Sequence, residues 1–209
     1  MKTLLDLENW NRKEHFEHFC RMEEPFFGVT VEIDCTKAYQ TAKSLNSSFF
    51  IYYLHKTLVA VNTIENFRYR ISEGKIYIND RIDASATIGR EDGTFGFSLI
   101  EYNSDFRIFE KIALAEIERI QKTTGLFTRS FDDDNVIHFS AIPWLNFTSL
   151  SHARSYTFPD SCPKISFGKM MTSESGKRTI AISVHVHHGL MDGLHVGQFV
   201  DAFQDLMNS

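Results

Sequence analysis

A change of hydrophobic period near the C-terminal end constrains this fold more than any other feature. Ile180, Ile182, Val184 and Val186 alternate with small or polar residues, which is the two-residue period of a β-strand. Beyond Gly193 the apolar residues recur at helical spacing, at positions 196, 199, 200, 203 and 207. The chain therefore passes from a strand through a short turn into a helix. That turn reads His-His-Gly-Leu-Met-Asp-Gly, so its histidines would be rigidly held and yet reachable.

Three interpretations of these histidines are open from the residues alone. In the first, a histidine at a strand end is only a satisfied polar side chain. In the second, His185 and His187 share one strand face and chelate a metal with Asp192 or His195, although a complete ligand set in register is missing. In the third, one histidine is a general base and Asp192 anchors the turn, because imidazole moves protons near neutral pH.

Length and charge exclude several classes of protein. The 209 residues are enough for one domain spanning 1–209. The net charge of −5 and the lack of a basic tract argue against nucleic-acid binding. No apolar run approaches the ~20 residues that span a bilayer, and early acidic residues argue against a signal peptide. Three widely spaced cysteines suit reduced thiols. We therefore expect a cytoplasmic protein without a membrane partner.

Periodicity along the rest of the chain predicts one two-layer α/β sandwich, with a mixed, largely antiparallel sheet packed on helices. The segment 146–163 is polar and irregular and predicts a long loop, and 67–79 predicts a hairpin. The other expected elements are helices at 8–22, 36–45, 49–63 and 105–122, and strands at 27–33, 82–88, 94–100 and 135–142.

Five segments in succession form a more specific pattern. They are Asn9–Phe16 (NWNRKEHF), the Phe67-Arg68 pair with the later Gly74, Thr94-Phe95, Phe139–Trp144 (FSAIPW) and His187–Gly193 (HHGLMDG). Together they resemble the chloramphenicol acetyltransferase family over nearly the whole chain. The resemblance implies the CoA-dependent acyltransferase fold and a homotrimer with active sites at the subunit interfaces. It also implies acetyl-CoA as co-substrate, a small hydroxyl compound as acceptor, and no metal.

The resemblance also assigns residues to the chemistry. His188, the second histidine of the pair, matches the general base, and Ser140 matches the serine that stabilises the oxyanion. Asp192 matches an aspartate that pairs with an arginine, here Arg12, and so supports the histidine turn. Taken without the resemblance, Ser140 is a strand hydroxyl bonded to backbone, and Asp192 is the N-cap of the last helix.

Other matches concern the two substrates. Trp144 aligns with a tryptophan near the CoA site, and Ser166 falls where the family has a threonine that binds a bridging water. The acceptor side is matched by an aromatic or imidazole set, whose ordinary alternative is core packing: Phe19, Phe95, Phe127 and His138.

Departures from the family pattern fall on the acceptor side. An extra residue lies near Pro25–Gly28, His138 replaces a frequent asparagine, and the 146–163 loop differs. We therefore expect O-acetylation of chloramphenicol or a similar small alcohol. The alternatives are transfer to another acceptor, an acyltransferase akin to the dihydrolipoamide acyltransferase core, or a non-catalytic binder of a hydrophobic ligand on the same fold.

Overall fold

The computed structural model describes residues 1–129, 134–155 and 160–209. Its described part contains a six-stranded sheet in the order β2-β9-β8-β7-β5-β6. Strand β7 runs parallel to β5 and β8, and the other neighbours are antiparallel, so the mixed, largely antiparallel sheet is confirmed. The bounds are β2 Phe26–Asp34, β5 Asp83–Gly89, β6 Phe95–Phe97, β7 Val136–Ala141, β8 Lys164–Thr172 and β9 Arg178–His187.

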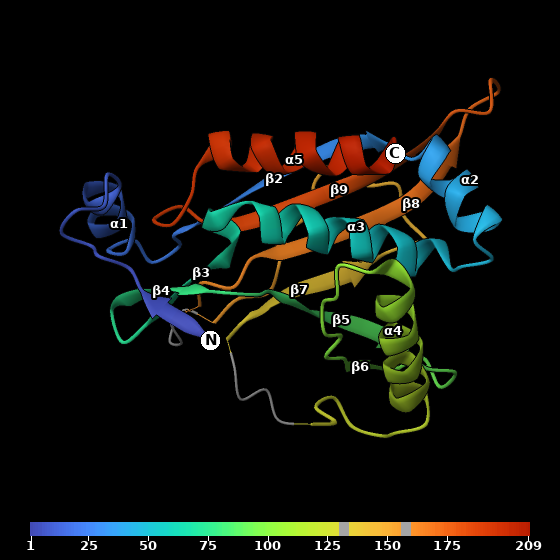
Figure 1. The fold of residues 1–209 in the computed structure, drawn as a ribbon, viewed down its shortest axis with the longest axis horizontal. Helices are drawn as coiled ribbons and strands as arrows, with labels where there is room; N and C mark the ends of the chain where they lie inside the picture. Colours follow the sequence, from blue (N-terminus) through green and yellow to red (C-terminus); the bar gives the residue numbers. More distant parts are fainter. Residues whose placement is uncertain (130–133, 156–159) are drawn as a thin grey trace.

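Helices cover one face of this sheet. Figure 1 shows α3 (Phe49–Thr63) and α5 (Gly193–Met207) side by side across it, with α2 (Thr36–Ser44) at one end and α4 (Phe106–Gln121) over β5 and β6. The short α1 (Lys13–Phe19) stands at the opposite end, near a second sheet. That sheet has the order β1-β4-β3, with β1 Lys2–Leu4, β3 Tyr69–Ser72 and β4 Lys75–Asn79.

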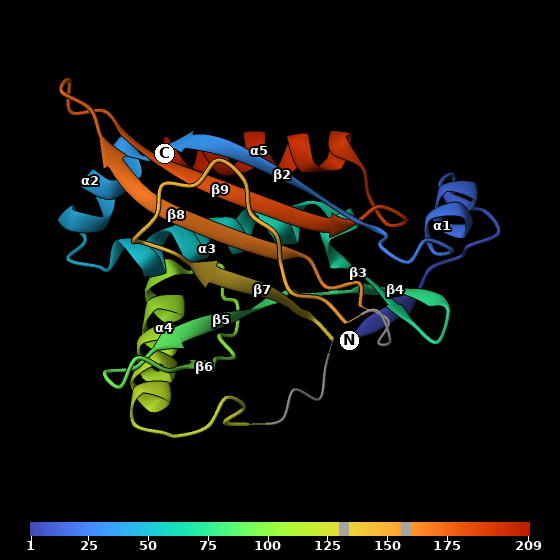
Figure 2. The ribbon, with the colours of Figure 1, turned by 180° about the vertical axis from the view of Figure 1, so that it is seen from behind.

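The two faces of the large sheet differ in chemistry because successive side chains of a strand point to opposite sides. Phe139, Ile165 and Val184 are in register on three neighbouring strands and lie buried in the core. Each neighbour one step along points to the other face, where a row of hydroxyl groups crosses the sheet: Ser140, Ser166, Ser183 and Thr30. Figure 2 shows this face, crossed by the segment that follows β7. The hydroxyl row therefore lies on the face that the helices leave uncovered.

Most expected elements are present, with three corrections. The helices at 36–45, 49–63 and 105–122 match α2, α3 and α4 within a residue, but the expected helix at 8–22 shrinks to α1. Phe67 was expected in a strand, yet it lies in a 3-10 turn, Glu65–Arg68, where it is fully buried against Phe199. The strand at 94–100 is reduced to β6, and beyond it an isolated bridge pairs Ile100 with Ala84.

Two strands were not expected at all, β1 and β8. The described parts of 146–163 hold neither helix nor strand, and residues 156–159 of that expected loop lie outside the described residues. Over the described ranges, no helix combines the length and apolar character that crossing a membrane requires.

Candidate active site

The turn between β9 and α5 is built around Asp192. As the N-cap of α5, its Oδ1 accepts from the Leu194 backbone N–H at 3.0 Å, and the His195 Nδ1 lies 2.9 Å from the same oxygen. The Asp192 backbone N–H donates to His195 Nδ1 at 3.1 Å, and this bond completes a capping box. Such reciprocal bonds satisfy the free N–H groups at a helix start. The expected N-cap role of Asp192 is confirmed.

Arg12 joins this turn to the N-terminal segment. Its Nη1 donates to Asp192 Oδ2 at 2.5 Å, and its Nη2 donates to the backbone carbonyl of His188 at 3.3 Å. The Arg12 side chain is only 10% exposed. Burial disfavours the Asp192 charge, but the bond from Arg12 and the nearby His195 outweigh it and lower the Asp192 pKa. The expected Arg12–Asp192 pair is confirmed.

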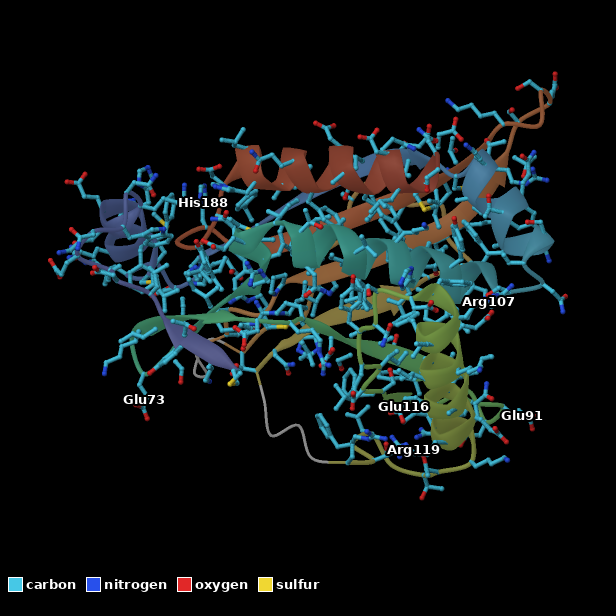
Figure 3. The ribbon with its side chains drawn as sticks, in the orientation of Figure 1. Glu73, Glu91, Arg107, Glu116, Arg119 and His188 are labelled. Carbon is cyan, nitrogen blue, oxygen red and sulfur yellow. The ribbon has the colours of Figure 1, made fainter. Side chains whose placement is uncertain are left out.

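The His188 ring is clamped between aromatic rings. It stacks on Phe19 with 3.8 Å between ring centroids and 6° between planes, and Phe27 covers it at 4.6 Å. The His188 backbone N–H donates to Pro25 O at 2.8 Å. Its Nδ1 is buried and has no hydrogen-bond partner among the described residues. Figure 3 shows His188 where the turn faces α1. The ring is therefore held by packing more than by hydrogen bonds.

The first histidine of the pair has a different environment. His187 is 4% exposed, and its Nδ1 accepts from the Gly189 backbone N–H at 3.1 Å. Burial, and next the positive charge of Arg154, lower the His187 pKa to about 4. The ring is thus neutral at physiological pH and braces the turn, whereas His188 is the partly exposed member.

The remaining histidines of this stretch do not converge on a metal. His185 meets the ring of His152 edge-on at 4.8 Å, and His195 serves the Asp192 cap. Within the described ranges no three His, Cys, Asp or Glu side chains are placed to hold an ion. The metal interpretation of His185 and His187 has no geometric support.

Ser140 lies far from His188 within one chain. Ser140 pairs with Ser166 on β8, and Ser166 pairs with Ser183 on β9, five positions before His188. Strands rise about 3.3 Å per residue and lie about 4.8 Å apart, so the two residues are roughly 16 Å apart along the strands and about 10 Å apart across them. One chain does not bring the expected base and the expected oxyanion donor together.

The residues expected near CoA lie on the side of Ser140. Ser166 is fully buried, and its Oγ is 3.4 Å from His152 Nε2. Trp144 follows β7 and is 78% exposed, which leaves its indole face free for a flat partner.

The four residues expected around the acceptor are divided. Phe19 lies on His188, whereas Phe127 and His138 line a separate cavity of about 730 Å³ beside β3, β5 and β7. Phe95 lines a separate hollow beside Thr94 and Leu126. Phe97, which sequence reasoning did not single out, lies between Phe95 and Phe127. Its ring centroid is 5.7 Å from that of Phe95 and 5.2 Å from that of Phe127.

The cavity also holds polar residues that sequence reasoning missed: Arg70, Ser85, Asp160 and Cys162. Burial opposes protonation of His138, but the adjacent Cys162 outweighs burial and raises the His138 pKa. In the sequence, only His138 in place of the family's frequent asparagine pointed to these polar residues. Cys162 could not be placed beside it, because the pairing of β7 with β8 brings the two segments together.

Comparisons with known proteins agree with this architecture. The family model described as chloramphenicol acetyltransferase matches residues 1–204. Chloramphenicol acetyltransferase 3 of Escherichia coli is 31% identical over 99% of this chain and 97% of its own length. The chloramphenicol acetyltransferase of Campylobacter coli is 28% identical over 99% and 98%.

Solved structures give the same answer. A chloramphenicol acetyltransferase superposes with a TM-score of 0.90 at 32% identity, covering 99% of this chain and all of the other. A probable dihydrolipoamide acetyltransferase from Listeria monocytogenes has a TM-score of 0.67 at 13% identity, covering 93% and 88%, which shows a shared fold alone. The chain belongs to the chloramphenicol acetyltransferase family and is an acyltransferase.

Proposed function

We propose that this protein transfers acetyl from acetyl-CoA to a hydroxyl group of chloramphenicol or a similar small alcohol. The observation that carries the proposal is the fixed position of the His188 ring. The ring stacks on Phe19 with 3.8 Å between centroids, and its turn is held by the bonds of Arg12 to Asp192 and to the His188 carbonyl. A base held in one orientation needs little reorganisation when its proton moves, which favours general base catalysis.

In the proposed mechanism, His188 takes the proton of the acceptor hydroxyl through Nε2 as that oxygen attacks the thioester carbon. The tetrahedral intermediate carries an oxyanion, and the Ser140 hydroxyl donates a hydrogen bond to it. Collapse releases the CoA thiolate, which recovers the proton from His188. Base catalysis of this kind contributes about 10²–10⁴-fold, and one oxyanion donor contributes about 2.7–4 kcal/mol.

We propose that each site is shared by two chains of a homotrimer. The support is the separation of His188 from Ser140, roughly 19 Å when the offsets along and across the strands are combined. A tetrahedral intermediate requires both groups within hydrogen-bond reach. The His188 end of one subunit facing the hydroxyl row of the next would meet that requirement, and a closed ring of three repeats it three times.

The substrate assignments follow from this arrangement. Trp144 and Ser166, beside Ser140, are proposed to contact the CoA side. The aromatic cavity with Phe127 and His138, joined by Phe19 and Phe95, is proposed to receive the acceptor. Its volume of about 730 Å³ lies within the range of small-molecule sites, about 300–1,000 Å³. Three free cysteines support a reducing compartment such as the cytoplasm.

The test is release of free thiol from acetyl-CoA, with and without chloramphenicol, for the wild type, His188→Ala and His15→Ala. His15 is exposed on α1, so its variant controls for loss of an imidazole elsewhere. We expect chloramphenicol-dependent release that survives in His15→Ala and is lost in His188→Ala. Near-normal release by folded His188→Ala would refute the mechanism. Release that depends on other alcohols alone would replace the acceptor and keep the chemistry.

A further inference from the structure

Cys162 and His138 line the cavity that is proposed to receive the acceptor, and neither has a role in the proposed acetyl-transfer steps. Cys162 lies two positions before β8, and its Sγ–H donates to the Val136 carbonyl at 3.1 Å. The next strand position that faces the cavity is His138, whose backbone N–H donates to Pro163 O at 3.1 Å. The pairing of β7 with the start of β8 therefore holds the thiol beside the imidazole.

The Cys162 backbone is pinned by an ion pair. Its N–H donates to Asp160 Oδ1 at 2.8 Å, and its carbonyl accepts from Lys164 Nζ at 3.1 Å. Lys164 also bonds the other oxygen of Asp160, so the two side chains bracket the cysteine. These bonds fix the Cys162 backbone beside the start of β7.

A buried cation adds to the local field. Arg70 is 1% exposed, and every hydrogen bond found for it in the described residues goes to a backbone carbonyl: Phe67, Tyr69, Asp134 and Val136. It lines the same cavity, where within the described ranges it has no hydrogen bond to a carboxylate, although the carboxylates of Asp134 and Asp160 also line that cavity. A guanidinium in this position favours a sulfur anion.

The titration of the pair is consistent with this geometry. Burial alone would raise the Cys162 pKa, but His138, followed by Arg70 and Lys164, outweighs burial and lowers it. The other two cysteines behave in the opposite way, since burial raises the Cys20 pKa to about 11 and the Cys35 pKa to about 12. Cys20 and Cys35 therefore serve as internal controls for the reactivity of Cys162.

We propose that Cys162 and His138 form a nucleophilic pair, and that Cys162 is a covalent modification site for soft electrophiles small enough to enter the cavity, such as haloacetamides. The thiol proton passes to the His138 ring, and the sulfur attacks the electrophilic carbon. A sulfur–carbon bond forms, the carbon–halogen bond breaks, halide leaves, and His138 returns its proton to solvent. This site does not depend on acetyl transfer being the activity.

Iodoacetamide labelling of the folded wild type at several pH values, read for each cysteine by peptide mass spectrometry, tests the proposal. At pH 7.5 Cys162 is expected to react on the order of tenfold faster than Cys20, since the gain in thiolate exceeds the loss of intrinsic nucleophilicity. Equal or slower labelling of Cys162 would overturn the proposal without the use of any variant.

Two variants identify the partner. Cys162→Ser should lose the fast label and leave the slow labelling of Cys20 unchanged. His138→Gln keeps a polar side chain but removes the ionisable ring, and should move the pH midpoint of Cys162 labelling upward. Both are checked by circular dichroism and gel filtration before labelling. An unchanged midpoint in folded His138→Gln would refute the pair, whatever the outcome of the acetyl-transfer assay.

Discussion

Asp192 and Arg12 are separated by 180 residues in the chain, yet Oδ2 and Nη1 lie 2.5 Å apart. The same carboxylate caps α5 through its other oxygen, and the same guanidinium holds the His188 carbonyl. One ion pair thus fastens the start of a helix, the N-terminal arm and the backbone of the proposed base. Its effect on activity can be separated from its effect on stability.

Asp192→Asn should lower kcat/KM by on the order of 10²-fold, because asparagine keeps the cap but weakens the bond to Arg12, and small displacements of a catalytic group are costly. The matched control is Asp105→Asn, which alters the N-cap of α4, far from His188. We expect the control to retain its rate. Equal rates for both variants in a thiol-release assay would show that the pair has no part in positioning.

Phe19→Ala should reduce kcat, because it removes the ring stacked on His188 at 3.8 Å. An aromatic pair contributes about 0.5–1.5 kcal/mol beyond burial, which corresponds to a loss of roughly 2- to 10-fold. Phe19→Tyr keeps the stack and should stay close to wild type. If the tyrosine variant lost as much activity as the alanine variant, stacking would not be the reason.

Mixing subunits should restore activity if the site is shared. His188→Ala and Ser140→Ala are each expected to be inactive or nearly so. Refolded together in equal amounts, they should recover about one quarter of the wild-type sites, because each site takes its base from one chain and its donor from the next. Wild type refolded in the same way gives the reference. A mixture as inactive as its parents would place both residues in one chain's site.

The free energy of unfolding should fall on mild acidification, because the unfolded chain protonates His187 at a higher pH than the folded chain does. Its folded pKa is about 4 against an ordinary value of 6.5. The unfolded chain therefore takes up a proton near pH 6.5 and the folded chain only near pH 4, so the contribution is full above about 6.5 and is lost as pH falls towards 4. Between pH 7.5 and 5 the loss should be about 2 kcal/mol.

Urea unfolding at both pH values measures this effect. His187→Asn can still accept the Gly189 N–H bond but cannot titrate, so its free energy of unfolding should depend less on pH. His15→Asn, at an exposed position, should retain the wild-type dependence. An identical pH dependence in His187→Asn and wild type would assign the effect to other groups.

Gly28→Ala should destabilise the edge of the sheet, because a Cβ there would lie 2.3 Å from His185 Nε2. Overpacking of this kind costs about 1–3 kcal/mol. His185→Ala opens the space, so the double variant should lose less than the sum of the two single variants. Gly89→Ala is the control, since nothing lies within 4 Å of its added Cβ. Additive losses in the cycle would contradict the contact.

Local patterns were sufficient for much of this fold. The strand-to-helix change at 180–207 predicted β9, the turn and α5, because burial of one face imposes its period on the nearby residues. The Asp192 cap was predictable for the same reason, since it involves residues two or three positions away. The Arg12–Asp192 pair was implied by the family resemblance, although no local pattern contains it.

Pairing between distant segments was beyond the reach of local pattern. The strand β8 was missed, and with it the contact of Cys162 with His138, because the order β7-β8-β9 joins segments whose sequences do not reveal their neighbours. The separation of His188 from Ser140 has the same origin, since it follows from register across three strands. The sequence determined which side chains are candidates for the chemistry, because residue type and local period are properties of each segment. Tertiary structure alone decided which of them meet, because strand order and register depend on the packing of the whole sheet.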